Sequence, residues 1–497
     1  MKRRFACGLL AGIAMAGLLS ACSTATSPAT GRSFSTNISP QQEAALGQQE
    51  HPKILAEFGG AYTAQPALTA YITGIGQSVA ATAERKDVTY TFTVLDTPDV
   101  NAFAVPGGYV YITRGLLALA NNEAEVAGVL GHEIGHINAR HTAERMGQQQ
   151  QAQWEVLGAT LLGAILGGNT GANLAGGVMQ QHAQVQLAQY SQQQEFEADS
   201  LGVRYLKRAT YDPQAMATFL TDLRAQSQLE AKLAGKDPSV VDVDNMLASH
   251  PRTADRVQKA IAEAGPANPG GLLEPDAYLQ KIDGLIFGED PQDGVVDGTT
   301  FIHPSLHFAF TVPDGFKLAN EPDVVGASGP DGTVMMFSLA NPQPTGNLAD
   351  YIAGGQISKS VAFRNIEALT INGMPAATAV TKANTNKGAR DVRVVLVQHP
   401  QGTTYQFLFF TVPNVTSRYD TAFLQTARSF RQIGADEGNK YRPQRLRIVS
   451  VKSGDTVRTL AAGMVVAQAK EEWFRLLNEL QPGQEPTVGQ KVKIVTY

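Results

Sequence analysis

Apolar residues recur at helical spacing through much of the first 290 residues. The segment 66–84 (PALTAYITGIGQSVAATAE) repeats them every three or four positions, which predicts an amphipathic helix. The segment 121–146 (NNEAEVAGVLGHEIGHINARHTAERM) predicts a longer helix, with an asparagine placed to cap it and acidic residues in its first turn. Between them, residues 88–96 alternate like a strand, and residues 101–117 predict a second strand broken by a Pro-Gly-Gly turn.

The pattern changes near residue 299, where short apolar runs separated by turn residues replace the helical spacing. Residues 299–435 therefore predict a β-rich α+β accessory domain. Residues 446–497 predict a small βααβ unit that resembles a LysM module, with an SGDT turn after its first strand. LysM modules bind glycans such as peptidoglycan, so the resemblance implies that partner. A packing domain without a ligand is an equally weighted alternative.

A tract rich in glycine and alanine covers residues 156–179. It is interrupted by GGNTGAN, and each apolar half is far shorter than the roughly 20 residues that a membrane-spanning helix needs. We expect a buried helix or a membrane-facing lid here, and we favour the buried helix.

Length and composition restrict the class of protein. The chain has 497 residues, which predicts about three domains. The net charge of −5 argues against a nucleic-acid partner. The two cysteines are Cys7 and Cys22, both near the N-terminus, so a disulfide framework in the folded part is excluded.

The N-terminus is typical of an exported lipoprotein. A basic MKRR start precedes a short apolar segment, and Leu19–Cys22 (LSAC) resembles a bacterial lipobox. Residues 1–21 are then a signal peptide, and Cys22 is the lipidated residue that anchors the protein to a membrane. Ser23 at the next position favours the outer membrane over the inner one. The polar segment 22–40 predicts a flexible tether. A conventional signal peptide that ends near a cysteine is the alternative.

The chemistry begins in the long predicted helix. His132 and His136 are four residues apart, so both side chains lie on one helix face and can bind one ion. Glu133 is rotated by about 100° and is placed to take a proton from metal-bound water, as in an H-E-x-x-H zinc site. Glycine is unfavourable in a helix interior, so Gly131 and Gly135 indicate that another element approaches this helix closely.

A later helix offers the third ligand. A metzincin would need glycine at 139 and histidine at 142, but the sequence has alanine and threonine there, and His141 is out of register. We expect His141 at the surface or behind the ligands. Glu195 can complete a His₂Glu zinc site, and Asp199, one turn later, can accept the free N–H of a ligand histidine. Glu197 is the competing ligand but points off that face.

These paired motifs, HEIGH and EFEAD, resemble the Ste/HtpX family of zinc endopeptidases and its BepA-like periplasmic lipoprotein branch. The resemblance implies one Zn²⁺ per chain in a mainly α, zincin-type domain with a small β-sheet, over residues 41–290. It also implies that an edge strand including Asn101, Ala102, Phe103 and Ala104 pairs with extended substrate.

The segment SHPRTADR supplies two further residues by the same resemblance. His250 would cap the zinc in a closed state or stabilise the oxyanion, and both roles stay open. Arg256 would support the site or the substrate backbone. A proline-started helix is the competing explanation for His250, because Ser249-His250-Pro251 is also an ordinary helix cap.

The sequence thus predicts a periplasmic zinc endopeptidase that is anchored to the outer membrane. The resemblance implies quality control of misfolded or stalled outer-membrane proteins as the task. Unfolded or misassembled polypeptides would be substrates, and the outer-membrane assembly machinery would be a further partner. Two alternatives remain: a proteolytically silent chaperone or assembly factor, and a peptidoglycan-binding envelope protein with a latent protease domain.

Overall fold

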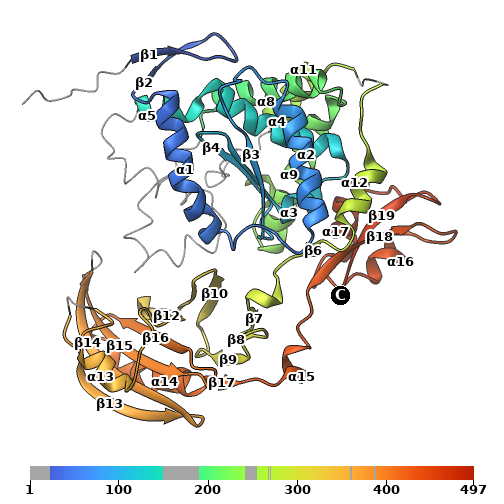
Figure 1. The fold of residues 1–497 in the computed structure, drawn as a ribbon. Coiled ribbons are helices and arrows are strands. Elements are labelled where there is room, and N and C mark those ends of the chain that lie inside the picture. The colour runs from blue at the N-terminus through green and yellow to red at the C-terminus, as the bar shows by residue number, and fades with distance from the viewer. Residues whose placement is uncertain are drawn as a thin grey trace, which may run out of the picture.

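The computed structural model describes residues 23–148, 190–240 and 254–497, apart from residues 267, 269, 359, 360, 386 and 387. It shows a helical domain with a small sheet, a β-rich domain set below it, and a C-terminal module that returns to the helical domain (Figure 1). Within these residues, no helix is both long and apolar enough to cross a membrane.

The first domain is built of helices around a three-stranded sheet. The strand order is β3-β5-β4, with β3 (Thr91–Leu95) parallel to β5 (Tyr109–Thr113) and β4 (Ala102–Val105) antiparallel to it. Strand β4 is therefore at one edge. The turn before β5 requires glycine, because Gly107 and Gly108 both have positive φ angles of 88° and 99°. The helices are α1 (Pro40–Glu57), α2 (Pro66–Ala80), α3 (Arg114–Leu119), α4 (Glu123–Ala139), α5 (His141–Gln148), α8 (Gln192–Arg208), α9 (Gln214–Leu233), α11 (Ala254–Ala264) and α12 (Pro275–Ile282).

Helices α4 and α8 pack closely through glycines. A Cβ atom on Gly135 would lie 3.1 Å from the Cβ of Leu201, and one on Gly131 would lie 3.4 Å from the Cα of Gly202. This confirms the prediction that another element approaches these two glycines. The predicted cap is also present, because the Asn122 side chain accepts a hydrogen bond from the Glu125 backbone N–H.

The predicted long helix is in fact two helices. Helix α4 ends at Ala139, and Arg140 adopts the left-handed conformation, with φ 60° and ψ 39°. Helix α5 then starts at His141. In one continuous helix, His141 would point about 140° away from His136. The break turns the chain and returns the His141 ring to His136.

The C-terminal module shares a sheet and a hydrophobic core with the first domain. Strand β6 (Ile286–Phe287) pairs with β18 (Gln444–Ser450), which in turn pairs with β19 (Lys491–Thr496). Helices α16 (Val457–Ala462) and α17 (Lys470–Leu477) complete the predicted βααβ order. Apolar side chains of the module, such as Phe474 and Val495, belong to the same core as the helices of the first domain.

The β-rich domain is an insertion between the paired strands β6 and β18. Its seven-stranded sheet has the order β10-β11-β12-β16-β15-β14-β13, and a four-stranded sheet has the order β17-β9-β8-β7. A core of phenylalanines and aliphatic residues joins the two sheets and helix α14 (Thr416–Arg428). The strands are β7 (Val295–Asp297), β8 (Thr300–His303), β9 (Phe308–Thr311), β10 (Lys317–Glu321), β11 (Val324–Ser328), β12 (Val334–Leu339), β13 (Arg364–Ile371), β14 (Met374–Thr385), β15 (Gly388–Gln398), β16 (Thr404–Thr411) and β17 (Arg431–Gln432). Helix α13 (Leu348–Ala353) lies between β12 and β13, and helix α15 (Ala435–Gly438) follows β17.

The N-terminal segment differs from the predicted flexible tether. Residues 23–36 form an antiparallel hairpin of β1 (Ser23–Thr26) and β2 (Ser33–Thr36), followed at once by the capped start of α1. Phe34 is buried in a small core with Ala143 and Met146 of α5. Composition suggested disorder because the segment is polar, but its few apolar side chains pack against a helix that begins more than a hundred residues later.

Candidate metal centre

Three ligand atoms converge between helices α4 and α8. The Nε2 atoms of His132 and His136 are 3.0 Å apart, and each lies 3.6 Å from a carboxylate oxygen of Glu195. All three side chains are buried. Two imidazole nitrogens and a carboxylate at these separations suit Zn²⁺, which accepts both donor types in a tetrahedral site. The structure thus brings together the three predicted ligands from two helices, although His136 and Glu195 are 59 residues apart along the chain.

Asp199 and Arg256 form a buried polar layer behind the ligands. The Nδ1 atom of His132 lies 2.9 Å from an oxygen of Asp199, so its N–H donates there and Nε2 is the nitrogen that can bind a metal. Arg256, from α11, donates to both oxygens of Asp199 and pairs with Glu195 at 2.7 Å. Burial favours the neutral form of Asp199, but the charge and hydrogen bonds of Arg256 outweigh it and hold the pKa of Asp199 well below its usual value.

Arg256 therefore lies behind the ligands. The resemblance implied that it supports the site or the substrate backbone, and its contacts here are of the first kind. Its guanidinium is only 3% exposed, and its contacts are with two acids of α8. We assign it no contact with substrate. Its charge compensates Glu195 and Asp199, which would otherwise be two buried carboxylates side by side.

His141 is a supporting residue behind the ligands, one of the two positions that the sequence left open for it. Its side chain is fully buried, its Nδ1 is 2.9 Å from Nδ1 of His136, and its Nε2 is 3.2 Å from Glu197. Glu197 in turn pairs with Arg32 of the N-terminal hairpin. Burial favours the neutral carboxyl, but the hydrogen bonds of His141 and Thr30 and the charges around it lower the pKa of Glu197 to about 2.

Tyr190 is a residue beside His136 that sequence reasoning missed. Its ring stacks on His136 with 3.9 Å between the ring centroids, and its hydroxyl is 3.0 Å from the Thr142 hydroxyl. The guanidinium of Arg145 covers the ring at 4.8 Å. Tyr190 and His136 line a small pocket together with Ala104 at the end of the edge strand. An aromatic residue just before the EFEAD motif was the available signal, but nothing in its spacing indicated this contact.

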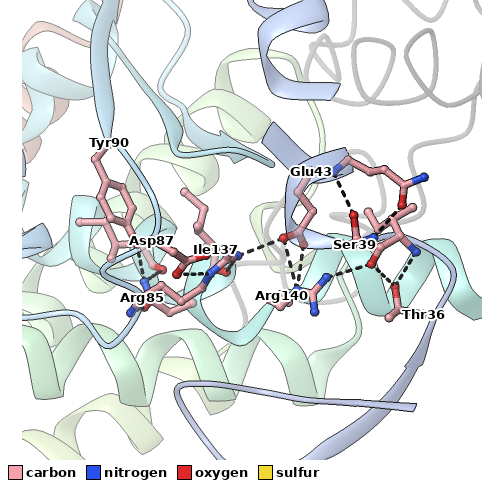
Figure 2. A network of polar contacts seen from close by, with 12 residues as sticks. Thr36, Ser39, Glu43, Arg85, Asp87, Tyr90, Ile137 and Arg140 are labelled. Carbon is pink, nitrogen blue, oxygen red and sulfur yellow. Dashed lines mark hydrogen bonds and ion pairs between the residues drawn. The ribbon is translucent and has the colours of Figure 1, made fainter. Parts of the chain in front are cut away.

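The C-terminal end of α4 is held by ion pairs with the start of α1. Figure 2 shows Glu43 between Arg85 and Arg140, with Arg85 also donating to Asp87 and to the Ile137 carbonyl. Arg140 donates a further hydrogen bond to the carbonyl of Ile38. These contacts fix the point where the ligand-bearing helix ends and the chain turns toward His141.

Some of the remaining predicted residues are described by the structure, and the others lie outside the described residues. Glu133 is 2% exposed and follows His132 directly on α4. Asn101 precedes β4, and Ala102, Phe103 and Ala104 lie in it, with β5 on one side of that strand. His250, Cys22 and the segment 156–179 lie outside the described residues.

Comparison with known proteins agrees with this arrangement. Residues 66–264, which include both ligand-bearing helices, match the model of peptidase family M48. This part of the chain is an M48 peptidase domain. The match ends before the β-rich insertion and the C-terminal module, neither of which it covers.

Named relatives of the M48 domain are proteases. The chain is 33% identical to the beta-barrel assembly-enhancing protease of Yersinia pestis over 51% of this chain and 50% of the relative. It is 30% identical to the protein of the same name from Escherichia coli over 52% and 51%. It is 25% identical to the mitochondrial metalloendopeptidase OMA1 of Schizosaccharomyces pombe over 47% of this chain and 64% of that protein. The chain thus spans about half the length of the two bacterial relatives.

Proposed function

We propose that this protein is a zinc-dependent endopeptidase of the bacterial cell envelope. The observation that carries the proposal is the convergence of His132, His136 and Glu195 on one point inside an M48 domain. Three protein ligands leave the fourth position of a tetrahedral ion open, which is the arrangement of catalytic rather than structural zinc.

The residues around that point have distinct tasks. Zinc bound there would activate a water molecule and polarise the scissile carbonyl. Glu133 accepts the proton of the attacking water and returns it to the leaving amine. Asp199 holds His132 in the tautomer that presents Nε2, and Arg256 keeps Asp199 ionised and pairs with Glu195.

The edge strand β4 is the proposed site of substrate binding. Its partner β5 occupies one side, and Ala104 shares a pocket with the ligand His136. An extended peptide that pairs with β4 as an additional strand would therefore run past the metal centre. Side-chain specificity would be weak in this mode, because backbone hydrogen bonds supply most of the affinity. Unfolded or misassembled polypeptides fit such a site.

The proposed location and task follow from the N-terminus and the relatives. The lipobox-like LSAC supports anchoring at Cys22, in the periplasm and on the outer membrane. The names of the bacterial relatives support a role in outer-membrane protein assembly, with the assembly machinery as a partner. Peptidoglycan binding by the C-terminal module is less well supported, because apolar residues of the module are buried against the M48 domain.

The test compares the wild type with Glu133→Gln and His136→Ala. We expect the wild type to bind one zinc ion and to cleave casein. Glu133→Gln should retain zinc and lose hydrolysis by about two to four orders of magnitude. His136→Ala should lose both. Zinc content is measured by atomic emission after dialysis, and cleavage by release of labelled fragments. Proteolysis at the wild-type rate by Glu133→Gln would rule out the assigned mechanism.

A further inference from the structure

A chain of polar contacts connects the ligand His136 to the N-terminal hairpin. His136 contacts His141 through their Nδ1 atoms, and His141 contacts Glu197 through Nε2. The Glu197 carboxylate then accepts a hydrogen bond of 3.3 Å from Arg32. Arg32 is fixed by a bidentate pair with Glu144, at 2.6 and 2.7 Å. Side chains from α4, α5, α8 and the turn between β1 and β2 thus meet in one layer.

The hydrogen atoms in this series of polar contacts, the hydrogen-bond chain, can be assigned in one consistent way. A metal takes the lone pair of His136 Nε2, so Nδ1 of the same ring must carry the proton and donate. His141 then accepts at Nδ1 and carries its own proton on Nε2. That proton is donated to Glu197, a carboxylate that can only accept and that Arg32 stabilises in its charged form. Every contact therefore has one donor and one acceptor.

The two ligand histidines are supported by parallel arrangements. His132 donates directly to Asp199, and Arg256 holds that carboxylate. His136 reaches its carboxylate through one additional imidazole, and Arg32 holds that carboxylate. Outer partners of this kind orient a ligand ring and increase its basicity, and their removal costs about 10–100-fold in metal affinity.

We propose that Arg32, acting through Glu197 and His141, is a positioning residue for His136, so that the N-terminal hairpin helps to set the metal affinity of the site. This inference rests on the proposed zinc site. Arg32 touches neither the ligand nor the proposed substrate strand. Its effect reaches His136 through the successive hydrogen bonds of Glu197 and His141. The N-terminal hairpin is then a structural support of the metal centre.

A purely structural role for Arg32 is the competing explanation, since it also ties the hairpin to α5 through Glu144. The chain offers a matched control for that role. Arg204 of α8 donates to the Ala29 carbonyl of the same hairpin at 3.0 Å but contacts no member of the hydrogen-bond chain. Arg204→Ala therefore loosens the hairpin without altering the support of His136.

The experiment measures the zinc dissociation constant of the full chain by competition with a chromophoric chelator. We expect Glu197→Gln to weaken zinc binding about tenfold or more and Arg32→Ala about three- to tenfold. In the Glu197→Gln background, Arg32→Ala should have less than about a twofold further effect, because the path through Glu197 is already interrupted. Arg204→Ala should match the wild type. Thermal unfolding of each metal-free variant checks that it is folded, and Arg32→Lys, which loses the bidentate fork, replaces Arg32→Ala if the latter unfolds.

Two results would overturn the inference. One is an Arg32 variant with wild-type zinc affinity, and the other is a set of Arg32 and Glu197 effects that multiply in the double variant. The wild type and His136→Ala are measured in the same series. If these two bound zinc equally, the metal centre itself would be refuted. If they differed and Arg32 had no effect, the inference alone would fail.

Discussion

Lys493 gives the sharpest test of how the C-terminal module is attached. This residue of β19 is fully buried, and its ammonium donates to three backbone carbonyls at the end of α3, those of Ala118, Leu119 and Ala120. Burial lowers the pKa of Lys493 to about 8, although the acids Glu125, Glu479 and Asp222 act in the opposite direction. The residues that follow α3 cap the ligand-bearing helix α4. The contact therefore joins the module to the segment just before the ligand-bearing helix.

We expect Lys493→Met to destabilise the protein by about 3 kcal/mol. Hydrogen bonds from a charged donor contribute roughly 1.5–3 kcal/mol each, so three of them together contribute at most roughly 4.5–9 kcal/mol. Methionine fills a similar volume and avoids the several kcal/mol that it costs to bury an ammonium. The net loss is the difference between these two terms. The protein loses stability because the three carbonyls and the neighbouring acids no longer face a cation.

Urea unfolding followed by the fluorescence of Trp473 measures this loss. Trp473 packs edge-on against Phe287 of β6, with ring centroids 5.8 Å apart, and so reports on the contact between the module and the first domain. A Trp154→Phe background leaves it as the sole tryptophan. Lys491→Met is the control, because Lys491 is on the same strand but makes an exposed ion pair worth less than about 1 kcal/mol. Equal effects of the two substitutions would refute the reasoning.

Two further predictions concern pH and helix packing. Burial and the neighbouring Glu479 raise the pKa of Asp222 from 3.8 to about 8. The folded protein thus binds more protons than the unfolded chain over that range, and the free energy of unfolding should fall as the pH rises from 5 to 8, with a smaller slope in Asp222→Asn. A Cβ on Gly135 would lie 3.1 Å from the Cβ of Leu201, whereas the nearest atom to a Cβ on Gly131 would be the Cα of Gly202, at 3.4 Å. Gly135→Ala should cost about 1–2 kcal/mol and weaken zinc binding, whereas Gly131→Ala should be neutral or stabilising, as chemical denaturation and chelator competition will show.

The ligand set was accessible from the sequence because helical spacing is a local property. His132 and His136 are one turn apart on α4, and Glu195 and Asp199 are one turn apart on α8. Each pair therefore shares a helix face whatever the rest of the fold does. The glycine at position 135 added the information that a second helix approaches closely. Local pattern thus predicted both halves of the site.

The support of His136 was not accessible from the sequence, because it depends on where the chain turns. The left-handed Arg140 ends α4 and returns His141 to His136, and an arginine at that position gives no sequence signal for such a break. Arg32 reaches Glu144 and Glu197 across more than a hundred residues. No periodicity links positions so far apart, and polar composition alone suggested a tether.

The attachment of the C-terminal module was missed for the same reason. Its βααβ order follows from local pattern, but its shared core with the M48 domain depends on residues that the β-rich insertion separates in the chain. Lys493 lies between apolar residues in the last predicted strand, and this position was a possible signal. Lysine is rarely fully buried without a specific partner. Its partners, however, are backbone carbonyls, which the sequence cannot distinguish.

The most direct test of the central claim is X-ray diffraction from crystals of the zinc-loaded full chain, recorded on both sides of the zinc absorption edge. We expect one anomalous peak per chain, about 2.0–2.2 Å from Nε2 of His132, Nε2 of His136 and a carboxylate oxygen of Glu195. The absence of a peak between α4 and α8, or a peak coordinated by other residues, would contradict it.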